Sequence, residues 1–405
     1  MRCDLSHGIV TDDAARTITF HLLRPDPELA AHLALWAAAA VPASTRDHDT
    51  GTQPLPATGP YEVSSNTPRQ VTLVRNPFFH EWSHAAQPDG YPAKIVWRLG
   101  PSARGAVNAI ERGEADYTLD PPPADRLHEL RTRFASQLKI NPTDETIFMG
   151  LNTRARPFTD LRVRRRSVTR LTALSWRDCW ARTRTPSARC WHLIYPDIGP
   201  TAPTRSTPSD AGVWRGPDLV KARAFIAASG TRGTPITIWN QPGFFTDFTP
   251  SARYLASLLD RLGFPTRVKP FSVNDTTYLP RLANSRTSPQ AYFFTWSPNY
   301  PAASEFLGPQ FWSCHSFVPS STSNHNLSEF CDPQFDATVQ SALADEAAKS
   351  PTAAQLWAKA DRQFTDQAPI VDLVTPSQTD LVSRRVGNYQ FNPQLGVLLD
   401  QLWVH

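Results

Sequence analysis

Hydrophobic and polar positions follow two different periods along the chain, and each predicts its own kind of element. Gln70–Arg75 (QVTLVR) alternates polar and apolar residues, as a half-buried strand does. Ser251–Leu262 instead places Leu255, Leu258 and Leu259 on one side of a helix, and a glycine follows as an end signal. The chain therefore contains both strands and amphipathic helices.

The second half of the chain alternates these two kinds of element. Predicted helices cover Asp218–Ser229, Ser251–Leu262, Pro333–Lys349 and Ala353–Gln367. Predicted strands cover Pro235–Asn240, Thr266–Phe271, Gln290–Trp296 and Ile370–Val374. Alternation at this spacing is typical of an α/β lobe, so we expect an α/β fold.

Shorter elements occupy the rest. Predicted strands lie at Gly8–Leu22, Tyr61–Arg75, Ile95–Trp97, Asp116–Leu119, Leu138–Asn141 and Val386–His405. Predicted helices lie at Leu22–Leu33, Ser102–Arg112 and Ala124–Phe134. The turn signals Gly59-Pro60 and Asn76-Pro77 bound a hairpin, which makes Thr58–Arg98 the best-defined stretch of this half.

Length and charge narrow the functional classes. The 405 residues suffice for two or three domains. Net charge is +4, from 41 basic and 37 acidic residues, which is too balanced to indicate a nucleic-acid partner. The sequence has no apolar stretch long enough to span a membrane, and the chain as written shows no export signal.

Five cysteines give an odd count. Cys314 and Cys331 bound a stretch rich in Ser and Asn, for which we predict a disulfide; two unrelated thiols are the alternative. The sequence contains no C-x-x-C pair, which argues against a zinc ribbon.

One stretch of the sequence matches a catalytic motif. His80-Glu81-Trp82-Ser83-His84 fits H-E-x-x-H, which on a helix would bind zinc and give a metallopeptidase. Pro77 precedes it and Pro88 to Gly90 follow closely, so a helix is poorly supported there. Other catalytic signatures are absent. We therefore expect no catalytic residue, no metal and no cofactor, and keep the zinc peptidase as an alternative.

Several motifs occur together in one order. They are TGPY with the hairpin and RNPFF inside Thr58–Arg98, IERGEAD at Ile110–Asp116, FMGLNTRARPFTDLRVRR at Phe148–Arg165, and TWSPNYPAASEFL at Thr295–Leu307. This series resembles the extracytoplasmic solute-binding proteins of ABC importers, in the oligopeptide/dipeptide-binding family (family 5). The resemblance implies a two-lobe periplasmic-binding-protein-like fold of class II, of the large peptide-binding type.

The resemblance also implies a domain organisation. Residues 1–55 correspond to the remnant of an extra small domain, 56–148 to lobe I, 149–372 to a ligand-closing lobe, and 373–405 to a return to lobe I. The hinge would lie at the crossings near 148 and 372. Family members usually begin with an export signal, a lipid-attachment cysteine and further strands of lobe I. We therefore expect this chain to be N-terminally truncated, with part of lobe I and of the extra domain missing.

The function that the resemblance implies is capture of a peptide or peptide-like solute for import. The partners would be that solute and ABC permease subunits in the membrane, and the location would be periplasmic or on the outer face of the cell membrane. The ligand-binding residues would be Trp296, Asn299, Tyr300 and Asn152. Trp296 also fits a plain core tryptophan.

Asn299 departs from the family pattern. Peptide-binding members place an aspartate there, which pairs with the α-amino group of the ligand. Asn299 can accept a hydrogen bond but supplies no charge, so recognition of an amino terminus is open and another solute is an alternative.

The resemblance breaks over Arg165–Ser209, which is dense in Arg and Trp and has no clean helical period. We interpret it as a frame-shifted stretch. A divergent exposed loop and a basic, aromatic nucleic-acid segment are the alternatives. Together with the expected truncation, this stretch makes a non-functional fragment a third hypothesis for the whole chain.

Overall fold

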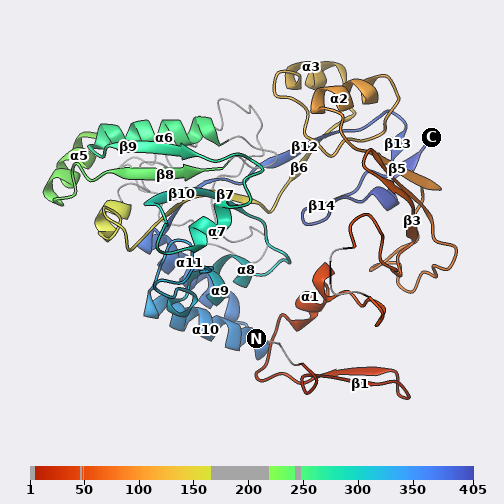
Figure 1. Cartoon of the computed structure of the whole chain (residues 1–405), viewed down its shortest axis with the longest axis horizontal. Helices are drawn as coiled ribbons and strands as arrows, with labels where there is room; N and C mark the ends of the chain where they lie inside the picture. The colour runs from red at the N-terminus through yellow and green to blue at the C-terminus, as the bar shows by residue number, and fades with distance from the viewer. Residues whose placement is uncertain (1–4, 46–47, 49, 166–218, 242–247) are drawn as a thin grey trace.

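The computed structural model of the chain describes residues 5–45, 48, 50–165, 219–241 and 248–405. Two groups of elements lie on either side of a two-stranded connection (Figure 1). We call the group with β3–β5, α2, α3 and the C-terminal strands lobe I, and the group with β7–β11 and α5–α11 lobe II. The part of the Arg- and Trp-rich stretch from 166 to 209, and the predicted cap Asp218, lie outside the described residues.

Lobe II is built on a five-stranded sheet with the order β11-β7-β10-β8-β9. Its strands are β7 (Thr146–Leu151), β8 (Ile236–Asn240), β9 (Thr266–Pro270), β10 (Ala291–Trp296) and β11 (Ile370–Val374). β7 runs antiparallel to β10 and β11, whereas β8 is parallel to β9 and β10. Every residue of β7 is buried, as expected of a central strand with both faces covered.

Two cores cover the two faces of this sheet. Ile147, Met149 and Leu151 point to one face, where they pack with α5 (Leu219–Ala228) and α6 (Thr249–Leu262). Phe148 points to the other face, which is largely aromatic. Five helices belong to that side: α7 (Tyr278–Ala283), α8 (Ser304–Leu307), α9 (Pro309–Trp312), α10 (Pro333–Ala347) and α11 (Ala353–Gln367). Figure 1 shows α6 and the pair α10–α11 on opposite sides of the sheet.

Local chemistry fixes where these elements start and stop. The predicted leucine stripe of α6 is buried, and Gly263 ends the helix with φ at 103°. The side chain of Asp332 accepts hydrogen bonds from the backbone N–H groups of Gln334 and Phe335, which starts α10. Gly150 has no side chain because a Cβ there would overlap the ring of Tyr292 on β10.

Lobe I contains a three-stranded antiparallel sheet and two helices. The strands are β3 (Tyr61–Thr67), β4 (Gln70–Arg75) and β5 (Lys94–Arg98), and the helices are α2 (Ala103–Glu111) and α3 (Leu127–Arg133). Short C-terminal strands join this lobe: β13 (Val386–Gly387), β14 (Phe391–Asn392), β15 (Gly396–Val397) and β16 (Trp403–Val404). The predicted strand Asp116–Leu119 is wrong, since only an isolated bridge from Tyr117 to Val382 forms there.

Two chain crossings join the lobes. β6 (Leu138–Pro142) leads directly to β7, and β11 leads directly to β12 (Ser377–Leu381). β6 and β12 pair as an antiparallel ribbon between the lobes (Figure 1). The domain boundaries at 55, 148 and 372 stay a prediction.

The N-terminal segment forms the hairpin β1 (Ile9–Asp12) and β2 (Thr17–Phe20), followed by α1 (Leu29–Leu33) and a 3-10 helix at Trp36–Ala38. Its contact with lobe II runs through His32, whose Nε2 lies 2.8 Å from the Tyr300 hydroxyl. Among the described residues, no helix is both long enough and apolar enough to cross a bilayer.

Candidate functional site

A cavity of about 590 Å³ opens on the aromatic face of the lobe II sheet. We call it the aromatic cavity. Most of its wall is apolar and aromatic, with Glu305 as its acidic group, and its aromatic lining includes Phe294, Trp296, Phe306, Phe311 and Trp312. Its volume lies within the range of small-molecule sites in proteins.

Two of these rings come from β10, where successive side chains point to alternate faces of the sheet. Phe294 and Trp296 lie two residues apart on one strand, so their side chains project to the same face. Trp296 Nε1 donates to the backbone oxygen of Glu305 at 2.7 Å, and its ring meets Phe311 edge-on at a centroid distance of 4.7 Å. Trp296 is thus both a wall of the cavity and part of the packing around it.

Asn299 and Glu305 form the polar corner of this region. Asn299 donates to Glu305 Oε2 from its backbone nitrogen at 2.7 Å and from its Nδ2 at 2.8 Å. Glu305 is 5% exposed and lines the aromatic cavity, whereas Asn299 is not among the lining residues. The structure therefore puts a carboxylate beside the uncharged residue that the sequence pointed to.

Tyr300 connects this corner to the N-terminal segment. Its hydroxyl lies 2.8 Å from His32 Nε2 and donates to Glu28 Oε2 at 3.1 Å, and Ser304 Oγ donates to the other oxygen of Glu28. Burial, and then the charges of Glu28 and Glu305, raise the pKa of Tyr300 above its ordinary value. Tyr300 therefore stays protonated and able to donate.

Asn152 lies elsewhere. It follows the end of β7, and Trp296 pairs with Thr146 at the opposite end of the same strand. Its Nδ2 donates to Ser288 Oγ at 3.1 Å and to Glu329 Oε1 at 3.0 Å. These bonds hold Asn152 inside lobe II, and it is not among the residues that line the aromatic cavity. Its role as a ligand residue stays a prediction.

The predicted disulfide crosslinks the segment that forms one side of the cavity. The sulfurs of Cys314 and Cys331 lie at bonding distance, 2.08 Å apart. The segment that they close contains Ser323, Asn324 and His325, all of which line the cavity. The disulfide therefore restrains one side of the candidate site.

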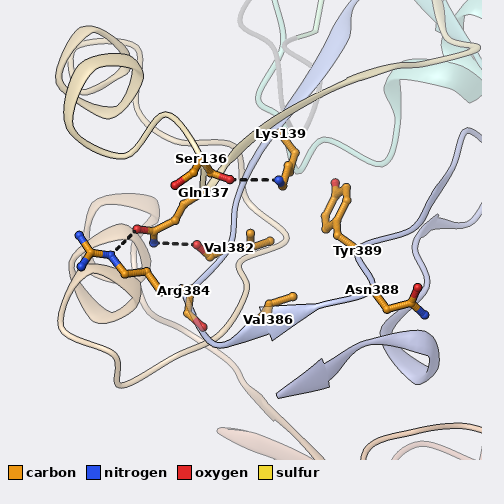
Figure 2. Close-up of a pocket in the computed structure, with 9 residues that line it drawn as sticks. Ser136, Gln137, Lys139, Val382, Arg384, Val386, Asn388 and Tyr389 are labelled. Atoms are coloured by element: carbon orange, nitrogen blue, oxygen red, sulfur yellow. Dashed lines mark hydrogen bonds between the residues drawn. The ribbon is translucent and has the colours of Figure 1, made fainter. Parts of the chain in front are cut away.

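A second cavity, of about 500 Å³, lies in lobe I beside the β6–β12 ribbon (Figure 2). Gln137 accepts from Arg384 Nε at 3.1 Å and donates to the Val382 oxygen at 2.9 Å, while Lys139 Nζ donates to the Ser136 oxygen at 3.0 Å. Two cationic side chains, and no acidic one, are among the described residues that line it. Its charge suits an anionic group.

The H-E-x-x-H stretch gives no support to a zinc peptidase. Residues 80–84 form no helix, so His80 and His84 do not share a helical face. Glu81 accepts from the backbone nitrogen of Asp89, and then pairs with His84 at 3.2 Å; both contacts lower the pKa of Glu81. Across the described ranges, no three His, Cys, Asp or Glu side chains gather in a way that could hold a metal ion.

Sequence reasoning named Trp296 and Asn299 as candidates but not Glu305, which lines the aromatic cavity. A glutamate in the first turn of a four-residue helix is normally a solvated residue, and no periodic pattern marks this one as buried. The only signal was its position six residues after Asn299, inside the stretch already singled out.

Comparison with known proteins identifies the fold. The chain is similar to the structure of clavulanic acid biosynthesis oligopeptide binding protein 2, with a TM-score of 0.81, 23% identity, and coverage of 98% of this chain and 72% of that one. It is also similar to the periplasmic binding protein DppA from Helicobacter pylori in complex with the peptide STSA, with a TM-score of 0.74, 19% identity, and coverage of 99% and 75%. These likenesses confirm the predicted two-lobe α/β fold.

Sequence comparison points to the same group. The chain is 25% identical over 318 residues to the probable di/tripeptide-binding protein 5 of Pseudomonas aeruginosa, which covers 76% of this chain and 56% of that protein. The chain thus spans about half the length of this curated relative. Residues 7–165 match the family described as bacterial extracellular solute-binding proteins, family 5 middle. The chain is thus similar to this family over residues 7–165, and to a protein described as a peptide-binding protein over most of its length.

Proposed function

We propose that the chain is the substrate-binding component of an ABC transporter, which captures a peptide or peptide-like solute between its two lobes for import. The observation that carries the proposal is the aromatic cavity with a buried carboxylate, in a lobe that is joined to its neighbour by two short crossings. Such crossings are the usual form of a hinge, and closure about them would bury the ligand between the lobes.

The similarity to known proteins supports the same function. The relatives named above are peptide-binding proteins by description, and none is described as an enzyme. In this proposal the ligand leaves unchanged, the partners are ABC permease subunits in the membrane, and the protein works outside the cytoplasm. The lobe boundaries near 148 and 372 belong to the proposal as the expected hinge.

A binding experiment tests this function directly. The purified chain is titrated calorimetrically with a panel of synthetic dipeptides and tripeptides that have free termini. We expect saturable binding of at least one panel member, with a smaller radius of gyration by X-ray scattering in its presence. No heat of binding across the panel would contradict the proposal.

Matched tryptophan variants locate the site. Trp296→Ala removes a wall of the aromatic cavity. We expect it to weaken peptide binding by roughly tenfold, because losing the ring's contact and burial should cost about 1.4 kcal/mol, which is tenfold in affinity. Trp82→Ala removes a ring that is 72% exposed in lobe I and serves as the control. Equal affinities of the two variants would place the ligand elsewhere.

A further inference from the structure

Asn324 is a buried amide in the wall of the aromatic cavity. It is 7% exposed and belongs to the segment that the disulfide between Cys314 and Cys331 closes. Its backbone nitrogen donates to the oxygen of Ala283, the last residue of α7, at 2.9 Å. Ala283 lines the same cavity. The backbone of Asn324 is therefore held against a helix, and its side chain has a defined place in the wall.

The two polar atoms of this amide have different surroundings. Oδ1 accepts a hydrogen bond from the backbone nitrogen of Val318 at 2.7 Å. Nδ2 has no hydrogen-bond partner among the described residues. The bond from Val318 also fixes which way the amide faces, because a flipped amide would set two donors against each other. The cavity wall thus contains an amide donor for which no described residue supplies the acceptor.

An unpaired donor in a buried position is costly. Burial removes the water that would otherwise accept from the amide, so free energy is lost unless another acceptor takes its place. Gln310, Ser323 and His325 also line the cavity, but they are exposed and can bond to solvent. Asn324 differs from them because it is buried. A ligand in the cavity would supply the acceptor that Asn324 Nδ2 lacks.

The chemistry of the cavity limits what this acceptor can be. A ligand carboxylate would meet Glu305, whose own carboxyl group lines the cavity, and an ammonium group has no acceptor to offer. The rings of Phe294, Trp296 and Phe311 favour a flat apolar body. An aromatic ring that ends in a neutral acceptor fits best. Among the side chains of phenylalanine, tryptophan and tyrosine, only tyrosine has an acceptor, because the indole nitrogen of tryptophan is a donor only.

We propose that Asn324 is a specificity-determining residue of the aromatic cavity: its Nδ2 donates to the phenol oxygen of a ligand tyrosine, whose ring packs among the aromatic side chains of the wall. This inference rests on the proposed function and narrows its substrate class to peptides that contain tyrosine. A phenylalanine ring would fill the same space but leave Nδ2 unpaired, so it would bind less tightly. The selection acts on a side chain of the ligand and not on its termini.

The first arm of the test uses the wild-type chain and two matched pairs of dipeptides. Calorimetry compares tyrosyl-alanine with phenylalanyl-alanine, and alanyl-tyrosine with alanyl-phenylalanine. We expect the tyrosine peptide to bind at least about tenfold more tightly than its phenylalanine partner in one pair or both. Equal affinity within both pairs, or binding of other panel peptides and none of these four, would overturn the inference and leave the proposed function standing. No binding by any panel peptide would overturn both.

The second arm tests the residue. Asn324→Asp still accepts from Val318 but replaces the unpaired donor with an acceptor, so we expect the ratio of tyrosine to phenylalanine affinity to fall below about threefold. Gln310→Glu adds the same charge at an exposed position of the same lining and should keep the wild-type ratio. Because the readout is a ratio, a general loss of affinity does not change it. A wild-type ratio in Asn324→Asp, or an equal fall in both variants, would overturn the assignment of Asn324.

Discussion

Asn299 directs two donors, its backbone nitrogen and its Nδ2, at the same oxygen of Glu305, at 2.7 and 2.8 Å. The amide is therefore complementary to the carboxylate, and a carboxylate in its place would not be. This pairing explains why an uncharged residue fits at position 299 in this chain.

The first prediction concerns Asn299→Asp. The change brings a second carboxylate against Glu305, and like charges at this distance raise the pKa of the pair. The folded state then binds a proton that the unfolded state has released, so the free energy of unfolding falls as pH rises. We expect a loss of about 1–3 kcal/mol at pH 8 that largely disappears at pH 5.

Urea unfolding at the two pH values measures this effect. Asn274→Asp adds the same charge at an exposed position and is the control. A loss in Asn299→Asp that is equal at pH 5 and pH 8 would show that lost packing, not charge, is responsible.

The second prediction concerns Tyr300→Phe. The change removes the hydroxyl that links His32 and Glu28 of the N-terminal segment to lobe II. We expect faster hydrogen exchange and faster proteolysis of residues 26–36, with a loss of about 1–2 kcal/mol of docking free energy. Tyr91→Phe, a half-exposed ring in lobe I, is the control. Unchanged protection of residues 26–36 would mean that Ser304 and packing alone hold the segment.

The third prediction concerns the disulfide. Cys314 and Cys331 are separated by 17 positions, and closing a loop of that length stabilises a fold by about 3 kcal/mol through the entropy of the unfolded chain. We expect the double variant Cys314→Ser, Cys331→Ser to lose roughly that amount in urea unfolding. Reductant should lower the stability of the wild type toward that of the variant and leave the variant unchanged. Equal sensitivity of both proteins to reductant would contradict the assignment.

Periodicity predicted the long elements well and the short ones poorly. α6, α10 and α11 carry apolar residues at helical spacing, and β8 and β10 are dense apolar runs. The structure places all five within a few residues of the expected bounds. β12 (SQTDL) was not predicted, because its first four residues are polar. One of them, Asp380, is buried because its carboxylate accepts hydrogen bonds from Asn141 and Tyr389. α8 and α9 are four residues long, which is too short for any period to be read.

In the candidate site, too, some residues are marked by the sequence pattern and others are not. Trp296 was named as a candidate because it ends an apolar strand followed by Ser-Pro-Asn-Tyr-Pro, a pattern that the sequence alone shows. Glu305 was not, because its burial depends on Asn299 and on rings from α8 and α9 that only the fold brings together. The sequence could not place Asn152 relative to the cavity, because a polar residue that ends a strand looks the same whether it faces a ligand or Glu329.

The last prediction concerns Asp372 in β11. Its Oδ1 is buried without a hydrogen-bond partner among the described residues. Burial, and then the charge of Asp361, raise the pKa of Asp372 to about 7, while burial raises that of Asp361 to about 6. The pKa of an aspartate in the unfolded chain is about 3.9. Between about pH 4 and 7 the folded state therefore holds protons that the unfolded state has lost.

The raised pKa values of Asp372 and Asp361 make the stability of the fold depend on pH. Stability from this pair is highest at low pH and falls as pH rises, because the unfolded state binds fewer protons than the folded state. Asp372→Asn removes the titration and the buried charge. We expect the free energy of unfolding of the variant to exceed that of the wild type by about 1–3 kcal/mol at pH 8, and this difference to disappear at pH 5. Asp366→Asn, at an exposed position of α11, should keep the wild-type pH slope; if Asp372→Asn keeps it too, Asp372 is ionised in the folded protein and the burial argument fails.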